Sequence, residues 1–310
     1  FNFNSYLYFS YFFGLFMERQ KISKFARIVF FLLLVNLILI VYFFYFDKQK
    51  NNLEIVFLDV GQGDAILVKT PKDKNILIDG GPDRNIIYKL SSYIPQNKRT
   101  IDLMILTHPD IDHLTGLNEV FERYEVKNII YNGVEDDDPV YEEWQSLKEN
   151  KKIPFLIIKE RERLNIENNL YFDFFWPKED LTGKDFDNDN FYSLMMKMNF
   201  GSNSVLFTGD TEKEVEDILI KDNVNLKSDI LKVSHHGSKN ATTLDFLEKI
   251  KPIYAVISVG KDNSFGHPSF RVINNLERMG ITTLRTDEIG DIIFISNGQS
   301  IKLLNKEHKI

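Results

Sequence analysis

The amino-acid sequence predicts a four-layer αββα sandwich, in which two β-sheets lie between two layers of helices, preceded by one apolar N-terminal segment. Short runs rich in Val, Ile and Phe recur after residue 52, separated by clusters of Gly, Asp and Asn, as expected for strands joined by turns. Hairpins and strand–helix alternation occur twice, which indicates two sheets with helices outside. No boundary rich in Pro, Gly or Ser divides this region, so we expect one domain at residues 53–310.

The expected strands follow from these apolar runs and cover residues 53–58, 65–69, 75–78, 102–106, 127–131, 154–158, 170–175, 193–199, 204–207, 230–233, 253–259, 281–284, 291–295 and 300–303. The first two are joined by a turn around Gly61-Gln62-Gly63-Asp64. The expected helices cover residues 85–94, 115–124, 140–148, 212–220, 243–250 and 269–279. The acidic run at residues 135–139 is expected to be a solvated loop.

Composition excludes several classes of protein. The 310 residues include 38 basic and 45 acidic side chains and no cysteine, which excludes a disulfide scaffold, a cysteine zinc cluster and a cysteine nucleophile. Six basic and two acidic residues lie among the first 50, so the other 260 carry 32 basic and 43 acidic side chains, a formal charge of −11. This excess of acidic side chains argues against a protein that binds nucleic acid mainly by charge.

Residues 28–46 form an uncharged run of 19 residues, interrupted only by Asn36, that is long enough to span a membrane as one helix. A signal peptide has a shorter apolar core and a small-residue cleavage site, and the flank at 47–50 offers no such site. We therefore expect an uncleaved anchor at 28–46 and a connector at 47–52. Four basic residues precede the run and two follow it, which favours a single-pass protein with its N-terminus inside and its C-terminal domain outside the cytoplasm.

Residues 1–27 are expected to be a leader and basic flank. Residues 1–16 do not begin with methionine and consist largely of aromatic, low-complexity sequence. Met17, followed by a basic stretch, resembles a natural start, so we leave residues 1–16 out of the fold prediction. The alternative is that they form a second membrane-active segment.

The histidines indicate the chemistry. Five of the six lie in polar loops at strand ends, where functional sites are usually built. The loop Thr107-His108-Pro109-Asp110-Ile111-Asp112-His113 presents four ligand-type side chains within six residues. Imidazole and carboxylate are ligands that zinc and manganese accept, and their close spacing allows one turn to serve two adjacent ions.

Three further strand ends carry side chains of the same kind. Asp210 follows the apolar strand at 204–207, and its position suits a ligand that bridges two ions. His235 and His236 follow the next strand, and His267 precedes a helix, where it either faces an anionic ligand or is merely exposed in a capping loop. Asp79 either supports the ligand loop from behind or caps a turn.

With these residues assembled, the sequence resembles the metallo-β-lactamase fold superfamily. The resemblance rests on the order of Asp79, the His-x-Asp-x-Asp-His loop at 108–113, Gly209-Asp210 and Ser-His-His-Gly-Ser at 234–238. Three further features narrow the resemblance to the C-terminal hydrolase domain of ComEC-type DNA-uptake proteins. They are the string Leu58-Asp59-Val60-Gly61-Gln62-Gly63-Asp64-Ala65, Asp110 in place of the usual second histidine, and Gly266-His267-Pro268.

That resemblance implies an αββα sandwich with two divalent metal ions, Zn²⁺ or Mn²⁺, at the strand-end edge. By position, His108 and Asp110 would hold one ion, Asp112 and His113 the other, and Asp210 would bridge them. The resemblance also implies that His235 completes the shell of the second ion. His236 and His267 remain as candidates for substrate contact or proton donation, with no division of roles between them.

The sequence departs from the superfamily pattern in two ways. No histidine occurs between His113 and His235, where many members supply another ligand, and Asp189 or Asn190 is the nearest polar substitute. Such oxygen-rich ligation shifts the preference from zinc toward manganese. Full-length uptake proteins also carry a multi-helix channel before the hydrolase, whereas this sequence has one span, so a separate DNA-channel protein is a candidate partner.

The leading hypothesis is hydrolysis of a phosphodiester, in DNA, outside the cytoplasm, with Asp112 orienting the attacking water and His267 or His236 acting on the leaving side. The alternatives are a metallo-hydrolase of another substrate, such as a phosphocholine-type ester, lactam or lactone, and a non-catalytic DNA-uptake subunit. The sequence leaves the native metal, the substrate and the oligomeric state open.

Overall fold

The computed structural model describes residues 24–42, 52–182 and 189–304. The chain separates into two compact units, Phe1–Asn51 and Asn52–Ile310. In the first unit, Lys24–Tyr42 is a 19-residue helix with a mean hydropathy of 2.6, long and apolar enough to cross a membrane by length and composition. The predicted anchor at 28–46 overlaps this helix. Its last four residues, the connector up to residue 51 and the leader up to residue 23 lie outside the described residues.

One sheet of the second unit has eight strands. Its order is β17 (Ile301–Leu304), β16 (Ile292–Ser296), β1 (Leu53–Phe57), β2 (Ile66–Lys69), β3 (Asn75–Ile78), β5 (Leu103–Ile105), β7 (Ile129–Tyr131) and β8 (Phe155–Ile157). The strands from β17 to β3 pair antiparallel, and those from β3 to β8 pair parallel. The carboxyl ends of the parallel strands therefore meet at one edge.

The other sheet has seven strands. Its order is β15 (Thr282–Arg285), β14 (Tyr254–Ile257), β13 (Ile230–Lys232), β12 (Asn203–Phe207), β11 (Met195–Phe200), β10 (Leu170–Trp176) and β9 (Glu162–Glu167). The strands from β15 to β12 are parallel and the remainder antiparallel. A separate short parallel pair joins β4 (Thr100–Ile101) to β6 (Glu125–Val126).

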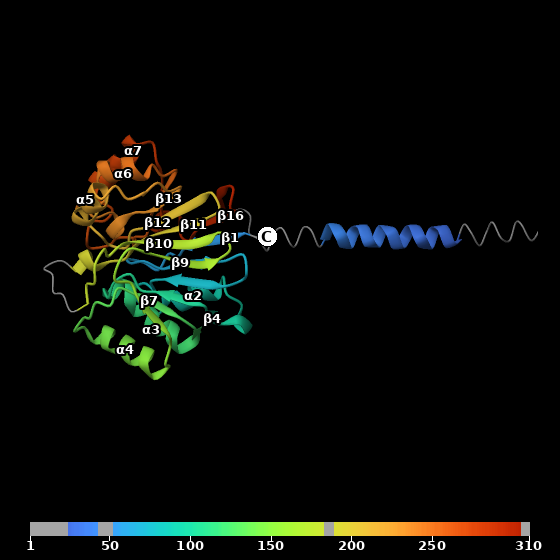
Figure 1. The fold of residues 1–310 in the computed structure, drawn as a ribbon, viewed down its shortest axis with the longest axis horizontal. Coiled ribbons are helices and arrows are strands. Elements are labelled where there is room, and N and C mark those ends of the chain that lie inside the picture. The colour runs from blue at the N-terminus through green and yellow to red at the C-terminus, as the bar shows by residue number, and fades with distance from the viewer. Residues whose placement is uncertain (1–23, 43–51, 183–188, 305–310) are drawn as a thin grey trace, which may run out of the picture. The chain divides into compact units, whose positions relative to one another are not determined.

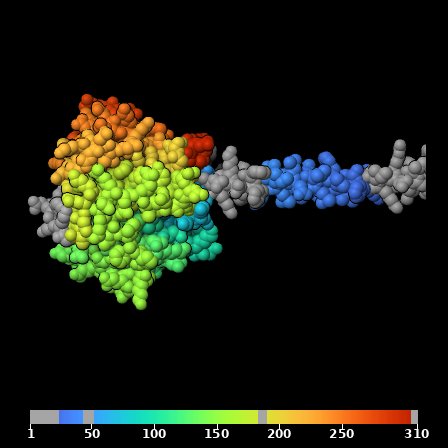
Figure 2. Space-filling view, viewed as in Figure 1, coloured from blue at the N-terminus to red at the C-terminus, as the bar shows by residue number. Residues whose placement is uncertain are grey.

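Helices cover the outer face of each sheet (Figure 1). Those that follow strands of the first sheet are α2 (Asn85–Ser91), α3 (Ile111–Arg123) and α4 (Pro139–Asn150). Those of the second sheet are α5 (Lys213–Lys221), α6 (Leu244–Ile250), α7 (Phe270–Arg278) and the short α8 (Thr286–Ile289). Single 3₁₀ turns occur at η1 (Gln96–Lys98), η2 (Asp189–Tyr192) and η3 (Ser234–Gly237). In Figure 2, the middle of the chain, in green to yellow, forms most of the face in view, and the orange part of the chain borders it on one side.

Three apolar clusters fill the spaces between the four layers. One lies between α2, α3, α4 and the first sheet, one between the sheets, and one between the second sheet and α5, α6 and α7. Strand β1 shows how period-two alternation builds two of them. Leu53, Ile55 and Phe57 enter the cluster between the sheets, whereas Val56 enters the cluster under the helices. The predicted αββα fold is confirmed.

The short elements β4, β6 and α8 were not predicted, and the structure differs from the predictions at two longer elements. Helix α3 begins at Ile111, not at residue 115, because the Asp110 carbonyl oxygen accepts hydrogen bonds from the N–H groups of His113 and Leu114, both at 2.9 Å. Strand β9 was not predicted, since charged and polar residues interrupt its apolar pattern. It is a half-exposed edge strand, where charged side chains discourage pairing with other chains.

We expect Asp291→Asn to destabilise the second unit by about 1–3 kcal/mol at pH 7. The Asp291 carboxylate, just before β16, accepts hydrogen bonds from Lys89 Nζ (2.8 Å), the Asp59 backbone N–H (2.9 Å) and Tyr93 Oη (2.8 Å). Burial by itself raises the pKa of Asp291, but the Lys89 ammonium and these hydrogen bonds outweigh it and lower the pKa.

Because the folded-state pKa is lowered, this stabilisation is present above the unfolded pKa of about 4 and disappears as the pH falls through the folded value. Urea unfolding followed by the fluorescence of Trp144 and Trp176 should therefore show a difference between wild type and variant at pH 7 that shrinks toward pH 3. The exposed Asp73→Asn is the matched control and should change little. A difference that is independent of pH would contradict this account.

Candidate metal centre

Ligand-type side chains from both sheets converge at the edge where the strands end. Asp79 follows β3, and the loop that begins at Thr107 follows β5 in the first sheet. Asp210 follows β12, and His236 follows β13 in the second sheet. Carboxyl ends of parallel strands share one edge, so four segments far apart in the sequence place their side chains together.

Asp79 supports the ligand loop from behind. Its carboxylate accepts hydrogen bonds from the backbone N–H (2.8 Å) and hydroxyl (2.8 Å) of Thr107, and His113 Nδ1–H donates to it at 2.9 Å. Of the two roles considered for Asp79, this geometry is that of a buttress. Since Nδ1 carries the proton, Nε2 of His113 is left as the ligand atom.

Two glycines allow the backbone of α3 to approach the loop after β3. A Cβ on Gly116 would lie 1.9 Å from the Gly80 carbonyl oxygen, and a Cβ on Gly80 would lie 2.4 Å from the Leu117 backbone nitrogen. Close contact is also fixed by hydrogen bonds, because the Gly80 N–H donates to the His113 carbonyl oxygen at 2.7 Å. Only glycine permits this approach, which brings His113 within reach of Asp79.

Asp210 occupies the centre of the cluster. Its Oδ1 lies 3.4 Å from His113 Nε2, and its Oδ2 lies 3.3 Å from His236 Nε2. Asp112 Oδ2 lies 3.2 Å from the same nitrogen of His236, and His108 Nε2 lies 3.4 Å from Asp110 Oδ2. Asp210 also forms one set of ligand atoms with His108 and His113, so its carboxylate lies within reach both of His108 and of His236, which is the arrangement expected of a bridging ligand.

The residues present fit a divalent metal ion. Nε2 of His108, of His113 and of His236 are all buried, and each faces carboxylate oxygens at 3.2–3.4 Å without making a hydrogen bond of good geometry among the described residues. Imidazole nitrogens and carboxylate oxygens that face one another in this way form the donor set of a divalent cation, which would bind all three nitrogens. Three ligand atoms lie within 4.8 Å of one another in the set His108, His113 and Asp210 and again in the set Asp112, His113 and His236.

The charge of the cluster also favours the binding of cations. Lys232 Nζ is buried in contact with Asp64 and lies 3.4 Å from Asp210 Oδ1. With neutral imidazoles, this lysine and the five carboxylates carry a formal charge of −4, which two divalent ions would neutralise. The five carboxylates are those of Asp64, Asp79, Asp110, Asp112 and Asp210.

The pKa shifts have the same cause. Burial by itself lowers the pKa of the His236 imidazole, but the carboxylates of Asp210, Asp112 and Asp64 outweigh it and raise the pKa to about 9. The carboxylate of Asp210 shifts in the opposite direction, since the positive charges of His236, His113 and Lys232 outweigh burial and hold its pKa well below the usual range. Protons thus take the place at these imidazoles that a metal ion would occupy.

His235 and His236 point in different directions. Both have left-handed backbone angles, with φ of 46° and 51°, in the turn η3. His236 Nδ1–H donates to the Ser258 carbonyl oxygen at 2.8 Å and directs Nε2 into the cluster. His235 is 24% exposed, contacts Glu212 through Nδ1 at 3.1 Å and lies 3.9 Å from Asp210 through Nε2. We therefore propose His236, in place of His235, as the ligand of the second ion.

The other predicted residues lie around this centre. The His267 ring lies at the rim with its centroid 5.4 Å from that of His235, and burial together with the charges of His235 and His236 lowers its pKa to about 4. Asn190 belongs to η2, and Ser193, the residue directly after that turn, contacts His108 Nδ1 through Oγ at 3.3 Å. The side chain of Asp189 lies outside the described residues.

Sequence reasoning assigned no role in the centre to three of its polar residues. Asp64 is buried against Lys232 and His236, although it lies in the string that carried the resemblance. The available signal for Lys232 was its position as a charged residue in the otherwise apolar strand β13. Ser193 Oγ accepts from the Asp210 backbone N–H at 2.9 Å, and nothing in the sequence distinguished this serine from others.

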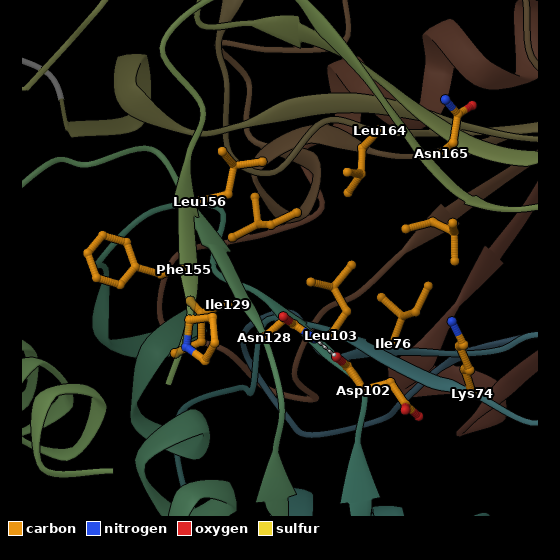
Figure 3. Close-up of a pocket in the computed structure, with 13 residues that line it drawn as sticks. Lys74, Ile76, Asp102, Leu103, Asn128, Ile129, Phe155, Leu156, Leu164 and Asn165 are labelled. Atoms are coloured by element: carbon orange, nitrogen blue, oxygen red, sulfur yellow. Dashed lines mark hydrogen bonds between the residues drawn. The ribbon is translucent and has the colours of Figure 1, made fainter. Parts of the chain in front are cut away.

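A separate cavity of about 320 Å³ lies at the opposite, amino ends of the parallel strands (Figure 3). It is lined by residues that begin or precede β3, β5, β7 and β8, including Asp102 and Phe155, and by Leu164 of β9. None of the five described histidines lines it. The cavity and the metal centre are therefore distinct.

The family follows from a match between residues 58–261 and the family model described as the metallo-beta-lactamase superfamily. This match covers more than half of the chain, which therefore belongs to that superfamily, and the fold just described is its fold. Members bind divalent metal ions, often two.

Relatives of the chain include competence proteins. Over 256 residues it is 32% identical to ComE operon protein 3 of Bacillus subtilis, covering 77% of this chain and 32% of that protein. Over 255 residues it is 28% identical to competence protein ComA of Neisseria gonorrhoeae, covering 79% and 32%. The predicted resemblance to ComEC-type proteins is confirmed, and the chain spans about a third of the length of these relatives.

A solved structure with the same fold is the Zn²⁺-bound PqqB of Methylobacterium extorquens. It superposes with a TM-score of 0.50 at 11% sequence identity, covering 75% of this chain and 97% of that one. At this identity the likeness concerns the fold alone.

We expect metal affinity to rise with pH between about 6 and 9, because binding displaces the protons that the carboxylates hold on His113 and His236. Titration calorimetry with Zn²⁺ in two buffers of different ionisation enthalpy should report proton release at pH 7. Asp210→Asn should lower affinity by more than the roughly 10–100-fold typical of residues that only support a ligand. Asp73→Asn should leave it unchanged, and metal binding without proton release would contradict the assignment.

Proposed function

We propose that this chain is a metal-dependent hydrolase that cleaves phosphodiester bonds, with DNA as its substrate. The observation that carries the proposal is the place of Asp210, whose ligand atom lies within 4.8 Å of that of His108, proposed for one ion, and whose Oδ2 lies 3.3 Å from His236 Nε2, proposed for the other. A bridging carboxylate between two ions suits in-line displacement at phosphorus, where both the attacking and the leaving oxygen need stabilisation.

The proposed ligands are His108 and Asp110 for one ion and Asp112, His113 and His236 for the other, bridged by Asp210. The set contains three imidazoles and three carboxylates, which suits either Zn²⁺ or Mn²⁺. When bound, such ions lower the pKa of water and neutralise charge that develops on the phosphate oxygens.

The chain's own groups supply the remaining steps. The Asp112 side chain is 31% exposed with Oδ2 on His236, so it can accept a hydrogen bond from an attacking water and orient it. His267 has a lowered pKa and is neutral at pH 7, so it serves the leaving oxygen by donating a hydrogen bond rather than as a protonated acid. The proposed division of roles is therefore ligation for His236 and substrate contact for His267.

The relatives named as competence proteins and the apolar helix support a role in DNA uptake at the cell membrane. The proposed topology is single-pass with the N-terminus inside and the hydrolase outside, and a separate DNA-channel protein is the proposed partner. The formal charge of −11 after residue 50 favours a second candidate, a hydrolase of a small ester, lactam or lactone.

The full chain in detergent, loaded with Zn²⁺ or Mn²⁺, is expected to cleave linear DNA. His108→Ala combined with Asp112→Ala should lower the rate by at least about 1,000-fold, since both ions lose a ligand. The matched control is Asp73→Asn, which should retain full activity. Asp73 lies in the turn before β3, at the end of the strands opposite the metal centre, where it pairs with Lys98.

A panel of chromogenic phosphodiesters, phosphomonoesters and lactams separates the candidates. Cleavage of a lactam or monoester in preference to every phosphodiester would favour the second candidate. If no substrate is turned over at measured full metal occupancy, the hydrolase function is overturned. The interpretation that then holds is a non-catalytic DNA-uptake subunit.

The absence of cysteine in the sequence allows a direct test of topology. Lys151→Cys, at the exposed end of α4, is expected to react with a membrane-impermeant maleimide on intact cells. Ser23→Cys, on the other side of the apolar run, should react only after the cells are opened. The reverse pattern would place the hydrolase in the cytoplasm and contradict the proposed location.

A further inference from the structure

An exposed aromatic ring lies next to the metal centre. Phe265 is 68% exposed and stacks on His267, with ring centroids 5.9 Å apart and an interplanar angle of 24°. His267 in turn meets the His235 ring edge to face at 5.4 Å. One face of Phe265 is therefore covered by an imidazole of the rim, and the other is open to solvent beside the site.

Hydrogen bonds hold the backbone of the loop that carries this ring. Asn263 Oδ1 accepts hydrogen bonds from the backbone N–H groups of Phe265 (3.2 Å) and His267 (3.0 Å), while its Nδ2 donates to the carbonyl oxygen of Gly260 (3.0 Å). The far end of the loop is tied to the histidine turn η3, because the Ser269 N–H donates to the Gly237 carbonyl oxygen at 2.8 Å. A ring presented by such a loop binds a flat partner with little loss of conformational entropy.

Basic side chains accompany the ring. Lys261 lies in the same loop and is exposed, as are Lys239 after η3 and Arg271 in the first turn of α7. The Arg271 guanidinium donates to the Lys239 carbonyl oxygen, so the segments that carry these two cations are in contact. Asp262 is the acidic member of the loop. Aromatic rings combined with Lys and Arg along a groove are the means by which proteins bind single-stranded nucleic acid.

We propose that Phe265 is a stacking platform for a nucleobase of the substrate, so that the site acts on single-stranded nucleic acid or on a frayed strand end. This rests on the proposed phosphodiesterase function and names its substrate class. A base reaches the open face of the ring only when it is unstacked from its neighbours, which a paired duplex prevents. The exposed lysines and arginine then contact the phosphates, which explains how an otherwise acidic domain holds an anionic polymer.

The test is the binding of a fluorescent phosphorothioate oligothymidylate of about 12 nucleotides, which resists cleavage, to the metal-loaded full chain. Phe265→Ala should weaken binding by about 5- to 100-fold, and Phe265→Leu should not rescue it, because a leucine keeps the apolar surface but not the ring. Phe265→Trp should bind at least as tightly as wild type. The control is Phe155→Ala, which removes another half-exposed ring at the remote cavity of Figure 3 and should not change binding.

The proposal requires that the blunt duplex of the same sequence binds more weakly than the single strand and shows no dependence on Phe265. Equal binding by the Phe265→Ala and Phe155→Ala variants, or no binding by wild type, overturns it. Binding that depends on Phe265 without any cleavage of an ordinary oligonucleotide supports the platform and overturns the phosphodiesterase. If Phe265→Ala cleaves an ordinary oligonucleotide with an unchanged KM, the phosphodiesterase function is supported and the stacking role of Phe265 is overturned.

Discussion

A buried ion pair between the two sheets determines the geometry on which the site depends. The Lys232 side chain, at the end of β13, is 1% exposed, contacts the Asp64 carboxylate from the turn between β1 and β2, and donates to the Gly209 carbonyl oxygen at 3.1 Å. An ammonium is buried at acceptable cost only when oxygen partners surround it. Lys232 therefore holds Asp64 of one sheet and Asp210 of the other at a fixed separation, and the imidazoles of His113 and His236 each lie within 4 Å of both carboxylates.

Around this pair, each imidazole of the proposed ligand set is positioned by a group that is not itself a proposed ligand. Asp79 orients His113, the Ser258 carbonyl oxygen orients His236, and Ser193 contacts both His108 and the Asp210 backbone. Such hydrogen bonds select the tautomer and leave Nε2 directed inward. The resulting cluster carries more negative charge than a buried site retains by itself, so divalent ions bound there would stabilise the fold.

The layers of the fold could be read from the sequence because buried strands are apolar runs and turns are rich in Gly, Asp and Asn. Prediction was weaker where local preference and tertiary contact compete. Strand β9 has charged residues within its apolar pattern, and it forms because its backbone pairs with the free edge of β10. Helix α3 starts early because Gly80 and Gly116 let it dock on the loop after β3, a contact between segments more than thirty residues apart.

The sequence by itself determined the superfamily, the αββα layers, the apolar helix and the set of strand-end loops that carry the ligands, because these depend on residue type and order along the chain. Only the tertiary structure decided which of two adjacent histidines faces the cluster, since His235 and His236 have the same chemistry and differ only in the direction that the left-handed turn gives them. It also revealed Asp64 and Lys232 as one ion pair, because a contact across two sheets leaves no trace in spacing along the chain.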